Sequence, residues 1–281
     1  MKFTKMHGLG NDFIVFDGRT EKVTDVDWQN YAPRLCDRNF GIGADGILLV
    51  LPAEKADYEM RVFNPDGSEP EMCGNGLRCF AKYIYDTSKD KKEVISVQTK
   101  AGIKLPVVEP EKGHVQGIEV DMGEPILHRK QIPLAGKDSA QVVGEELSIN
   151  GQSFKFTAVS MGNPHVVIFV DDVEKVDLPA LGPKIEHHEL FPERTNVEFV
   201  QVSNKKEANM RVWERGAGET LACGTGACAV LVAGVLNKKL DRMAVIHLEG
   251  GDLEIEWEAE KNHVLMTGPA VTVYQGEVNI I

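Results

Sequence analysis

The sequence predicts an α/β (α+β) protein made of two similar halves, each a strand-rich shell around one buried helix. Three observations predict this fold class. A set of motifs recurs at an offset of 150 residues. Each half carries short apolar runs bounded by turn residues, which are typical of strands. Each half also contains one Cys-Gly-x-Gly motif that leads into a helical pattern.

The repeat keeps the order, spacing and type of its residues. Two such units predict two pseudo-symmetric halves that face each other, because a solenoid would need at least three shorter repeats. The matched segments are 61–64 with 211–214 and 73–76 with 223–226, each 150 residues apart, and 10–13 with 162–165, 152 residues apart.

Short β-branched or aromatic runs bounded by Gly, Pro, Asn or Asp predict the strands. After Gly76, apolar residues recur at helical spacing as far as Ile84. The stretch 227–236 is apolar throughout, as in a helix that is buried on all sides. We therefore expect each repeated cysteine at the N-terminus of a buried helix. The predicted strands are residues 14–16, 47–51, 58–63, 166–170, 197–202, 210–213 and 271–274.

The repeat also predicts the domain organisation. We expect a first half at residues 1–119 and a second half at residues 120–269. The last predicted strand lies in the remaining segment, 270–281, and is expected to return to the first half.

Charge and hydrophobicity exclude several classes of function. The 281 residues carry a formal net charge of −12 without a basic cluster, which disfavours nucleic acid as a partner. The longest apolar run, residues 227–236, is shorter than the ~20 residues that span a bilayer, which disfavours a membrane protein. The first residues contain no apolar signal segment, so we expect a cytoplasmic protein.

The five cysteines do not predict a disulfide framework, because their number is odd and the chain is long. Cys79 and Cys228 lie inside the helical patterns and, like Cys36, are interpreted as packing residues. Zinc sites favour two to four residues between paired cysteines, whereas Cys73 and Cys79 have five residues between them and Cys223 and Cys228 have four, so that only one pair has a suitable spacing. A metal site is therefore not expected.

Cys73 and Cys223 differ from the other cysteines because both stand at a predicted helix start. The first N–H groups of a helix have no internal partner, and the helix dipole is positive there. A cysteine in this position can have a pKa lowered to about 3.5–7.5, and a carboxylate can bind the same N–H groups. Two opposed sites of this kind predict a reaction that removes a proton from one face of a carbon and returns one to the other.

Four segments carry a resemblance to a known family. They are Met-His-Gly-Leu-Gly-Asn-Asp-Phe at 6–13, Met-Cys-Gly-Asn-Gly-Leu-Arg-Cys at 72–79, Gly-Asn-Pro-His at 162–165 and Glu-Arg-Gly-Ala-Gly-Glu-Thr-Leu-Ala-Cys-Gly-Thr-Gly at 214–226. Together they resemble diaminopimelate epimerases over essentially the whole chain, and the last segment is highly specific. The resemblance implies a cofactor-independent interconversion of LL- and meso-2,6-diaminopimelate, on the route to lysine and peptidoglycan. It also implies two domains, each a barrel-like β-sheet wrapped around a central helix, and usually a homodimer.

The resemblance assigns roles residue by residue. Cys73 and Cys223 would be the base and the acid, exchanging roles with the direction of the reaction. His165 would lie near the site and is a candidate for tuning a thiol. The substrate-binding residues would be Gly74, Asn75, Gly224 and Thr225 for the carboxylate of the reacting centre, and Asn11, Asn64, Asn163, Asn196, Glu214 and Arg215 for the amino groups and the distal carboxylate.

Two positions depart from the family pattern. Met72 precedes the first thiol where some relatives carry an acidic residue, so no tuning of the thiol is expected from this neighbour. Gly46 lies where relatives can have a substrate-contacting amide, and it is not assigned a role.

Three alternatives remain open from the sequence. A proline or hydroxyproline racemase would typically carry a histidine where this chain has Asn75, and serine and proline where it has Leu221 and Ala222. A non-catalytic amino-acid-binding protein would not exchange the α-proton of its ligand. In a redox protein Cys73 and Cys223 would form a disulfide, but we expect such a bond as a liability of the site rather than its purpose.

Overall fold

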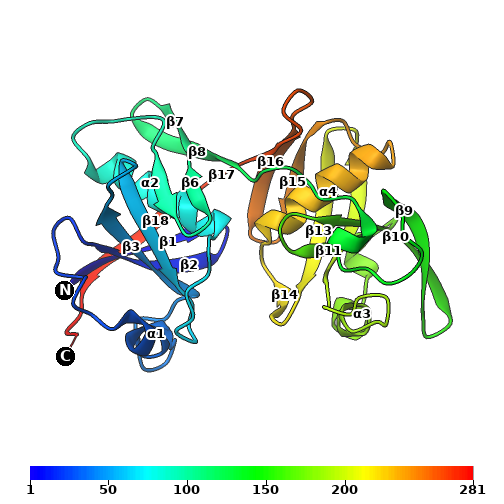
Figure 1. Ribbon diagram of the computed structural model, residues 1–281, viewed down its shortest axis with the longest axis horizontal. Helices are drawn as coiled ribbons and strands as arrows, with labels where there is room; N and C mark the ends of the chain where they lie inside the picture. Colours follow the sequence, from blue (N-terminus) through cyan, green and yellow to red (C-terminus); the bar gives the residue numbers. More distant parts are fainter. Residues whose placement is uncertain (281) are drawn as a thin grey trace. The chain divides into compact units, whose positions relative to one another are not determined.

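The structure is a computed structural model that describes residues 1–280. It divides into two compact units, Met1–Asp121 together with the segment from Thr267 onward, and Met122–Met266. The sequence analysis placed these divisions after residues 119 and 269. Its last segment, 270–281, includes residue 281, which lies outside the described residues. Each unit has a β-sheet and two α-helices (Figure 1).

The first unit is built on a seven-stranded sheet with the strand order β18-β1-β2-β3-β4-β5-β6. The pairs β2–β3 and β4–β5 are parallel, and the other pairs are antiparallel. β7 and β8 form a further antiparallel hairpin. The elements are β1 (Lys2–Gly8), β2 (Asn11–Asp17), α1 (Trp28–Cys36), β3 (Gly46–Pro52), β4 (Tyr58–Phe63), α2 (Gly74–Thr87), β5 (Val97–Thr99), β6 (Gly102–Lys104), β7 (Val107–Glu111), β8 (His114–Asp121) and β18 (Val271–Glu277).

The two helices of the first unit contact opposite sides of strand β3. Ile47 and Leu49 belong to the apolar cluster around Trp28 of α1, whereas Leu48 lies beside Gly76 of α2. A strand that is buried on both faces has a continuous apolar sequence, as β3 has, rather than an alternating one. The sheet therefore holds the start of α2 in a fixed place.

The two ends of the chain meet in the first unit. β18 pairs with β1 along the edge of the sheet, with Lys2 opposite Glu277. The terminal ammonium of Met1 donates to the carbonyl of Val278 at 2.8 Å. The edge strand is thus supplied by residues that follow the whole second unit in the sequence.

The second unit has the strand order β17-β16-β15-β13-β12-β11-β10-β9, and β14 pairs with β13. The pairs β11–β12 and β13–β15 are parallel. The elements are η1 (Arg129–Gln131), β9 (Val142–Ile149), β10 (Gln152–Ser160), β11 (Pro164–Phe169), η2 (Val173–Lys175), α3 (Leu178–Glu186), β12 (Asn196–Asn204), β13 (Glu207–Glu214), β14 (Gly218–Thr220), α4 (Gly224–Leu236), β15 (Met243–Leu248), β16 (Gly251–Trp257) and β17 (Val264–Gly268).

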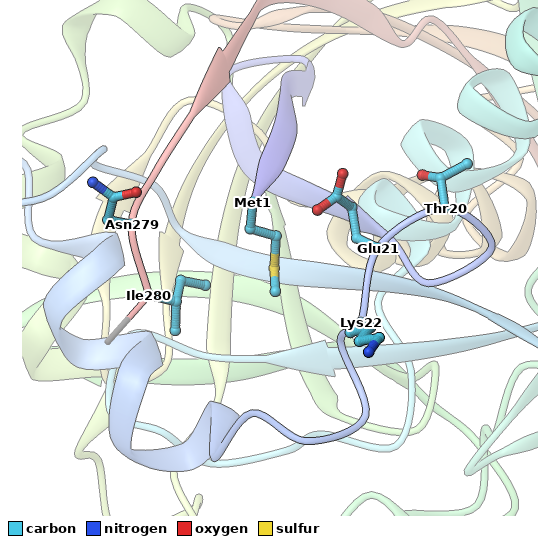
Figure 2. Close-up of a pocket in the computed structure, with 6 residues that line it drawn as sticks. All are labelled: Met1, Thr20, Glu21, Lys22, Asn279 and Ile280. Carbon is cyan, nitrogen blue, oxygen red and sulfur yellow. The ribbon is translucent and has the colours of Figure 1, made fainter.

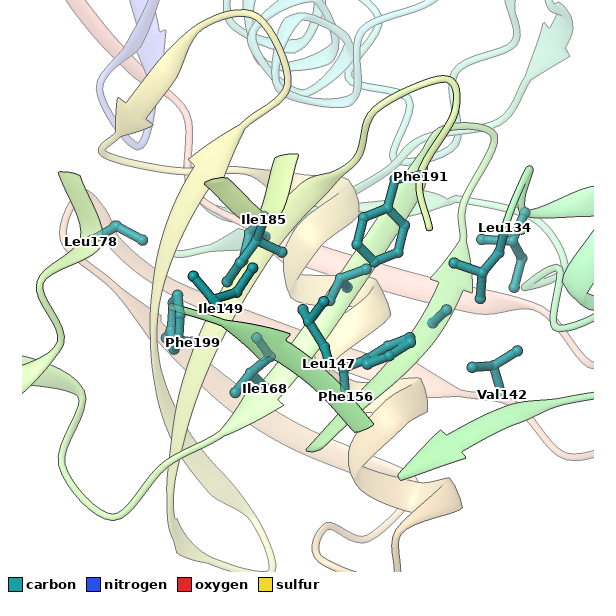
Figure 3. Packing of buried hydrophobic residues seen from close by; sticks show 14 of the residues in the cluster. Leu134, Val142, Leu147, Ile149, Phe156, Ile168, Leu178, Ile185, Phe191 and Phe199 are labelled. Atoms are coloured by element: carbon teal, nitrogen blue, oxygen red, sulfur yellow. The ribbon is translucent and has the colours of Figure 1, made fainter. Parts of the chain in front are cut away.

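Helix α4 is the central helix of the second unit. Its residues 226–234 are all buried, and it packs against β10, β11, β12, β15 and β16. On α3, Leu178 and Ile185 belong to an apolar cluster that includes Phe156 and Phe199 of the sheet (Figure 3). Although α4 is apolar on all sides, no helix within residues 1–280 is long and apolar enough to cross a membrane.

The repeat is preserved in the register of the strands. Phe13 pairs with Gly46 in the first unit, and His165 pairs with Asn196 at the corresponding place in the second. Each predicted strand lies within an observed strand, apart from Val170, which falls one residue beyond β11. The predicted helices begin at Gly74 and Gly224, directly after the two cysteines. The predicted fold class is therefore confirmed.

Helices α1 and α3 are not predicted by the sequence analysis. Both follow an aspartate N-cap, Asp27 and Asp177, and both contain a proline, Pro33 and Pro183, at the same position. They are therefore a further part of the 150-residue repeat. An interior proline is usually a helix breaker, so it obscures the helical pattern in a segment of nine residues.

Truncating a buried aromatic residue should show how strongly the second core contributes to stability. Phe199 is 0% exposed, so Phe199→Ala is expected to lower the free energy of unfolding by about 3–5 kcal/mol. Phe40 is 93% exposed, so the matched Phe40→Ala should change it by less than about 0.5 kcal/mol. Urea denaturation followed by circular dichroism measures both values. Equal losses in the two variants would contradict the packing described for Phe199.

Candidate active site

Cys73 is the N-cap residue of α2 in the first unit. Its Sγ accepts a hydrogen bond from the backbone N–H of Gly76 at 3.4 Å, which satisfies one of the N–H groups that a helix start leaves unpaired. Its thiol donates to Oδ1 of Asn11 at 4.0 Å. The side chain is half-buried. The first unit therefore presents a thiol at the positive end of a helix.

Asn11, at the start of β2, is fixed beside this thiol by two further hydrogen bonds. Its Oδ1 accepts from Nδ2 of Asn75 at 3.2 Å, and its own Nδ2 donates to Oδ2 of Asp45 at 3.0 Å. Oδ1 of Asn75 is buried and has no hydrogen-bond partner among the described residues. The first unit thus brings Cys73, Asn11 and Asn75 together, with Gly74 as the first residue of the helix.

Asn64 is not part of this hydrogen-bond network. It follows β4 directly, and its Nδ2 donates to Oγ of Ser68 at 2.9 Å. Its backbone N–H donates to the carbonyl of Ser68 at 2.8 Å. In the first unit Asn64 therefore closes a turn rather than contacting Cys73.

A charged cluster next to Asn11 was missed by the sequence analysis. Asp12 accepts from Lys5 at 2.7 Å and from Arg38 at 2.8 Å, and Arg38 also bonds Asp45 at 2.8 Å. Burial raises the pKa of Asp12, but the hydrogen bonds from Arg38 and Lys5 outweigh burial and leave the pKa lowered. Asp12 is thereby held as a carboxylate, and Asp45 in turn orients Asn11 through a hydrogen bond.

Cys223 is the N-cap residue of α4 in the second unit. It is 4% exposed, and its Sγ lies 3.5 Å from Oγ1 of Thr225. Gly226 leaves no room for a side chain here, because an added Cβ would lie 3.3 Å from that Sγ and 2.8 Å from Oε1 of Glu198. Gly224 is the first residue of the helix.

A chain of hydrogen bonds leads from Thr225 into the core of the second unit. Nδ2 of Asn163 donates to Oγ1 of Thr225 at 3.2 Å. Oδ1 of Asn163 lies 3.1 Å from Nε2 of His165, and Nδ1 of His165 lies 2.6 Å from Oε1 of Glu198. His165 and Glu198 are both 0% exposed. The predicted residues Asn163, His165 and Thr225 therefore do lie together with Cys223, and Glu198 joins them as a residue that the sequence analysis missed.

The expected lowering of the thiol pKa is wrong for Cys223. Burial raises the pKa of this thiol well above its ordinary value, and the nearby Glu214 and Glu198 raise it further. The effect of the helix N-terminus is too small to reverse this, because a buried thiolate loses its solvation. Burial also raises the pKa of Glu198.

The remaining predicted residues meet at the turn after β13. Oδ1 of Asn196 accepts from the backbone N–H of Arg215 at 2.9 Å, and Nη1 of Arg215 donates to the carbonyl of Glu193 at 3.0 Å. Glu214 accepts from the hydroxyl of Thr220 at 2.5 Å. These contacts fix the backbone of the turn that carries Glu214 and Arg215.

The turn has a second support that the sequence analysis missed. Glu186, at the end of α3, accepts from Nε1 of Trp213 at 2.7 Å and from the backbone N–H of Gly216 at 3.0 Å. The repeat aligns Glu186 with Cys36, whose side chain has a different chemistry, so the repeat does not predict this role of Glu186.

A hollow of about 520 Å³ is lined by Met1, Thr20, Glu21, Lys22, Asn279 and Ile280 (Figure 2). It contains none of the predicted site residues and no thiol or histidine. Within residues 1–280, no cluster of three or more His, Cys, Asp or Glu side chains is arranged to hold a metal ion. The two cysteines at helix N-termini remain the candidate acid–base groups.

Solved structures define the class of fold. The chain resembles a PhzF-family phenazine biosynthesis protein from Bacillus anthracis, with a TM-score of 0.71 and 17% identity, over 100% of this chain and 99% of that one. It also resembles a hydroxyproline epimerase from Agrobacterium vitis, with a TM-score of 0.69 and 15% identity, over 99% of this chain and 90% of that one. The fold of this chain is thus shared with a PhzF-family protein and with a hydroxyproline epimerase.

The sequence defines the family within that class. It matches the diaminopimelate epimerase family over residues 3–128 and 157–273. It is 57% identical to the diaminopimelate epimerase of Moorella thermoacetica, over 99% of both chains. It is 53% identical to that of Acetivibrio thermocellus, over 100% of this chain and 99% of the relative. The chain belongs to the diaminopimelate epimerase family and is an enzyme of the isomerase class, which confirms the resemblance found in its motifs.

The two thiols should differ in their reactivity. At neutral pH, iodoacetamide is expected to modify Cys73 before Cys223, because Cys73 is half-buried whereas Cys223 is buried with a raised pKa, and the thiolate is the nucleophile. Burial raises the pKa of Cys36 to about 11 and of Cys79 to about 12, so these thiols should stay unmodified. Mass spectrometry of peptides after timed reaction measures each site. Modification of Cys223 ahead of Cys73 would contradict the environments described above.

Proposed function

We propose that this protein interconverts LL- and meso-2,6-diaminopimelate by proton transfer at one α-carbon, with Cys73 and Cys223 as the two acid–base groups. The observation that carries the proposal is the repeat itself: each unit has a cysteine at the N-cap of its central helix, followed by glycine one and three residues later. The family relationship supports the substrate and the reaction. The product belongs to the biosynthesis of lysine and peptidoglycan.

The chemistry proposed needs no cofactor. One cysteine, as thiolate, removes the α-proton, so that a C–H bond breaks and an S–H bond forms. The other cysteine, as thiol, gives its proton to the opposite face of the same carbon, so that an S–H bond breaks and a new C–H bond forms. General acid and base groups of this kind each contribute about 10²–10⁴ in rate. In the reverse direction the two thiols exchange roles.

The intermediate is a carbanion next to a carboxylate, and its charge spreads onto the carboxylate oxygens. Unpaired N–H groups at the starts of α2 and α4 are suited to bind that charge. A donor aimed at such a charge is worth about 10²–10³ in rate. We assign this role to the backbone at Gly74, Asn75, Gly224 and Thr225. Glycine at the first helical position leaves the N–H groups open to a ligand.

The remaining polar residues are proposed to recognise the rest of the substrate. Arg215 can form a bidentate pair with the distal carboxylate, and Glu214 can pair with an ammonium group. Asn11, Asn163 and Asn196 each have an amide held by hydrogen bonds, which supports a role in orienting the substrate. Asn64 is proposed to join them from the turn after β4.

A test of the function is proton NMR of the reduced protein with LL-diaminopimelate in D₂O. We expect loss of the α-proton signal together with appearance of the meso isomer. Cys73→Ala and Cys223→Ala should each lower the epimerisation rate by about 10² or more, because each removes one of the two proton-transfer groups. Near wild-type turnover by Cys223→Ala would overturn the two-thiol mechanism.

The chain offers matched controls for these variants. Cys79 and Cys228 are buried in the same two helices, inside α2 and α4, and bear no proposed role. Cys79→Ala and Cys228→Ala should therefore keep their activity. If LL-diaminopimelate shows no exchange while the thiols are free, 4-hydroxyproline and proline are the next substrates to measure. Absence of exchange with all three would favour a binding protein.

We also propose that the protein is a cytoplasmic homodimer whose two compact units are the two halves of the enzyme. Three apolar side chains of the edge strand β18, Val271, Val273 and Tyr274, are exposed, which supports this strand as a contact surface. Sedimentation velocity is expected to give a dimer, and Val273→Lys should shift the population towards the monomer, because a buried interface would then contain a charge. A wild-type protein that sediments only as a monomer would exclude the dimer.

A further inference from the structure

The two units differ in what lies beneath the first turn of the central helix. In the first unit, the space beside Gly76 is bounded by Leu48 and Phe13. In the second unit, the corresponding space beside Gly226 is bounded by Glu198, which bonds His165. In the repeat, Glu198 takes the place of Leu48 and His165 takes the place of Phe13. An apolar pair in one unit is thus replaced by a buried polar pair in the other.

The hydrogen bonds of His165 restrict where the protons of this pair can lie. Oδ1 of Asn163 is only an acceptor, so Nε2 of His165 must carry a proton and donate to it. A neutral His165 then has a bare Nδ1, which at 2.6 Å from Oε1 must accept a proton from a protonated Glu198. Oε2 of Glu198 is buried without a hydrogen-bond partner among the described residues, and an ionised carboxylate would be poorly compensated there. A protonated Glu198 is therefore favoured, in agreement with its raised pKa.

With Glu198 protonated, all the hydrogen bonds from Glu198 to Thr225 run in one donor-to-acceptor direction. Glu198 donates to His165, His165 donates to Asn163, and Asn163 donates to Oγ1 of Thr225. The hydroxyl of Thr225 is left to donate its own proton to Sγ of Cys223, 3.5 Å away. A donor on this sulfur stabilises its thiolate and offsets part of its burial.

We propose that Glu198 is a positioning residue for Cys223, which acts through His165, Asn163 and Thr225 by keeping a hydrogen-bond donor turned towards the sulfur. Without a donor at position 198, the amide of Asn163 is free to turn and to present its oxygen to Thr225. The Thr225 hydroxyl then donates to Asn163 instead of Cys223. The inference deepens the proposed function, since it takes Cys223 to be one of the two acid–base groups.

The groups around Cys223 allow this role to be separated from a simple charge effect. Glu214 on β13 raises the pKa of this thiol, whereas Glu198 on β12 would raise it only as a carboxylate. His165 on β11 is the titratable group that bonds Glu198. If Glu198 acted only as a negative charge, its removal would lower the pKa of Cys223 and speed its alkylation. If it acts through the donor chain, loss of the donor must slow alkylation. The two roles predict opposite signs.

The experiment measures the alkylation rate of Cys223 by iodoacetamide against pH in the Cys73→Ala protein, with the site identified by mass spectrometry. Glu198→Leu is expected to slow the reaction about tenfold at neutral pH, the size expected for a lost hydrogen bond to a charged group. Glu198→Gln should leave the rate unchanged, because the amide N–H of glutamine can still donate to Nδ1 of His165. Thr225→Val removes the last donor and should slow the reaction as Glu198→Leu does.

Two controls complete the design. Glu145→Gln changes a glutamate of the second unit that pairs with Arg129 and lies outside the hydrogen-bond chain, and it should leave the rate unchanged. Should Glu198→Leu fail to fold, the double variant His165→Phe/Glu198→Leu copies the Phe13 and Leu48 pair of the first unit and should react as slowly.

The proposal is overturned if Glu198→Leu, or the double variant in its place, reacts at the parent rate or faster, or if Glu198→Gln is slowed to the same extent. The rate reports on the thiol alone, so it tests this inference even if diaminopimelate is not the substrate. Failure of the substrate assay and failure of the donor chain are therefore distinguishable.

Discussion

The first turn of each central helix packs so closely against its sheet that a side chain on the third residue after the cysteine would press on its neighbours. At Gly226 an added Cβ would lie within 3.3 Å of Cys223 and 2.8 Å of Glu198, and at Gly76 it would lie 3.2 Å from Leu48. Each cysteine lies at this helix start as the N-cap residue, and Sγ of Cys73 accepts a hydrogen bond from the backbone N–H of Gly76. The strands on either side, and the loops that carry the asparagines, are arranged around that fixed point. The motif Cys-Gly-x-Gly is thus a packing requirement as well as a chemical one.

The same scaffold produces two chemically different thiols. Around Cys73, Asn11 presents an acceptor oxygen, and the layer beneath the helix is apolar. Around Cys223, a hydroxyl lies beside the sulfur, and the layer beneath is a buried glutamate and histidine. The two units therefore share their backbone geometry, but the side chains beneath the first turn of the helix differ between them. In a two-base reaction one group releases a proton while the other accepts one. Different surroundings for the two cysteines are compatible with these different roles.

The parts of the fold that depend on local patterns could be predicted from the sequence. Strands such as Tyr58–Phe63 and the helix starts after both cysteines follow from apolar runs, glycines and the repeat. Helices α1 and α3 could not, because an interior proline hides their pattern. Glu198 and Asp45 could not either, since their partners lie 33 and 34 residues away and depend on strand pairing. Burial of Cys223 reversed the expected direction of its pKa, and burial is a property of the whole unit rather than of a motif. Among the candidate residues, Asn11, Asn75, Asn163, His165 and Thr225 cluster with the thiols, whereas Asn64 does not.

The pairing of β1 with β18 has a consequence for how the protein is made. The second unit is continuous in sequence, so a ribosome releases all of its strands in one stretch, and it can close its core while translation continues. The first unit contains the earliest strand of the chain and a partner for it that is synthesised only after the whole second unit. During translation the exposed side of β1 is an unpaired edge, the kind of surface on which nascent chains associate wrongly. The order of assembly is therefore inverted relative to the order of synthesis: the half of the molecule that is made first is completed last.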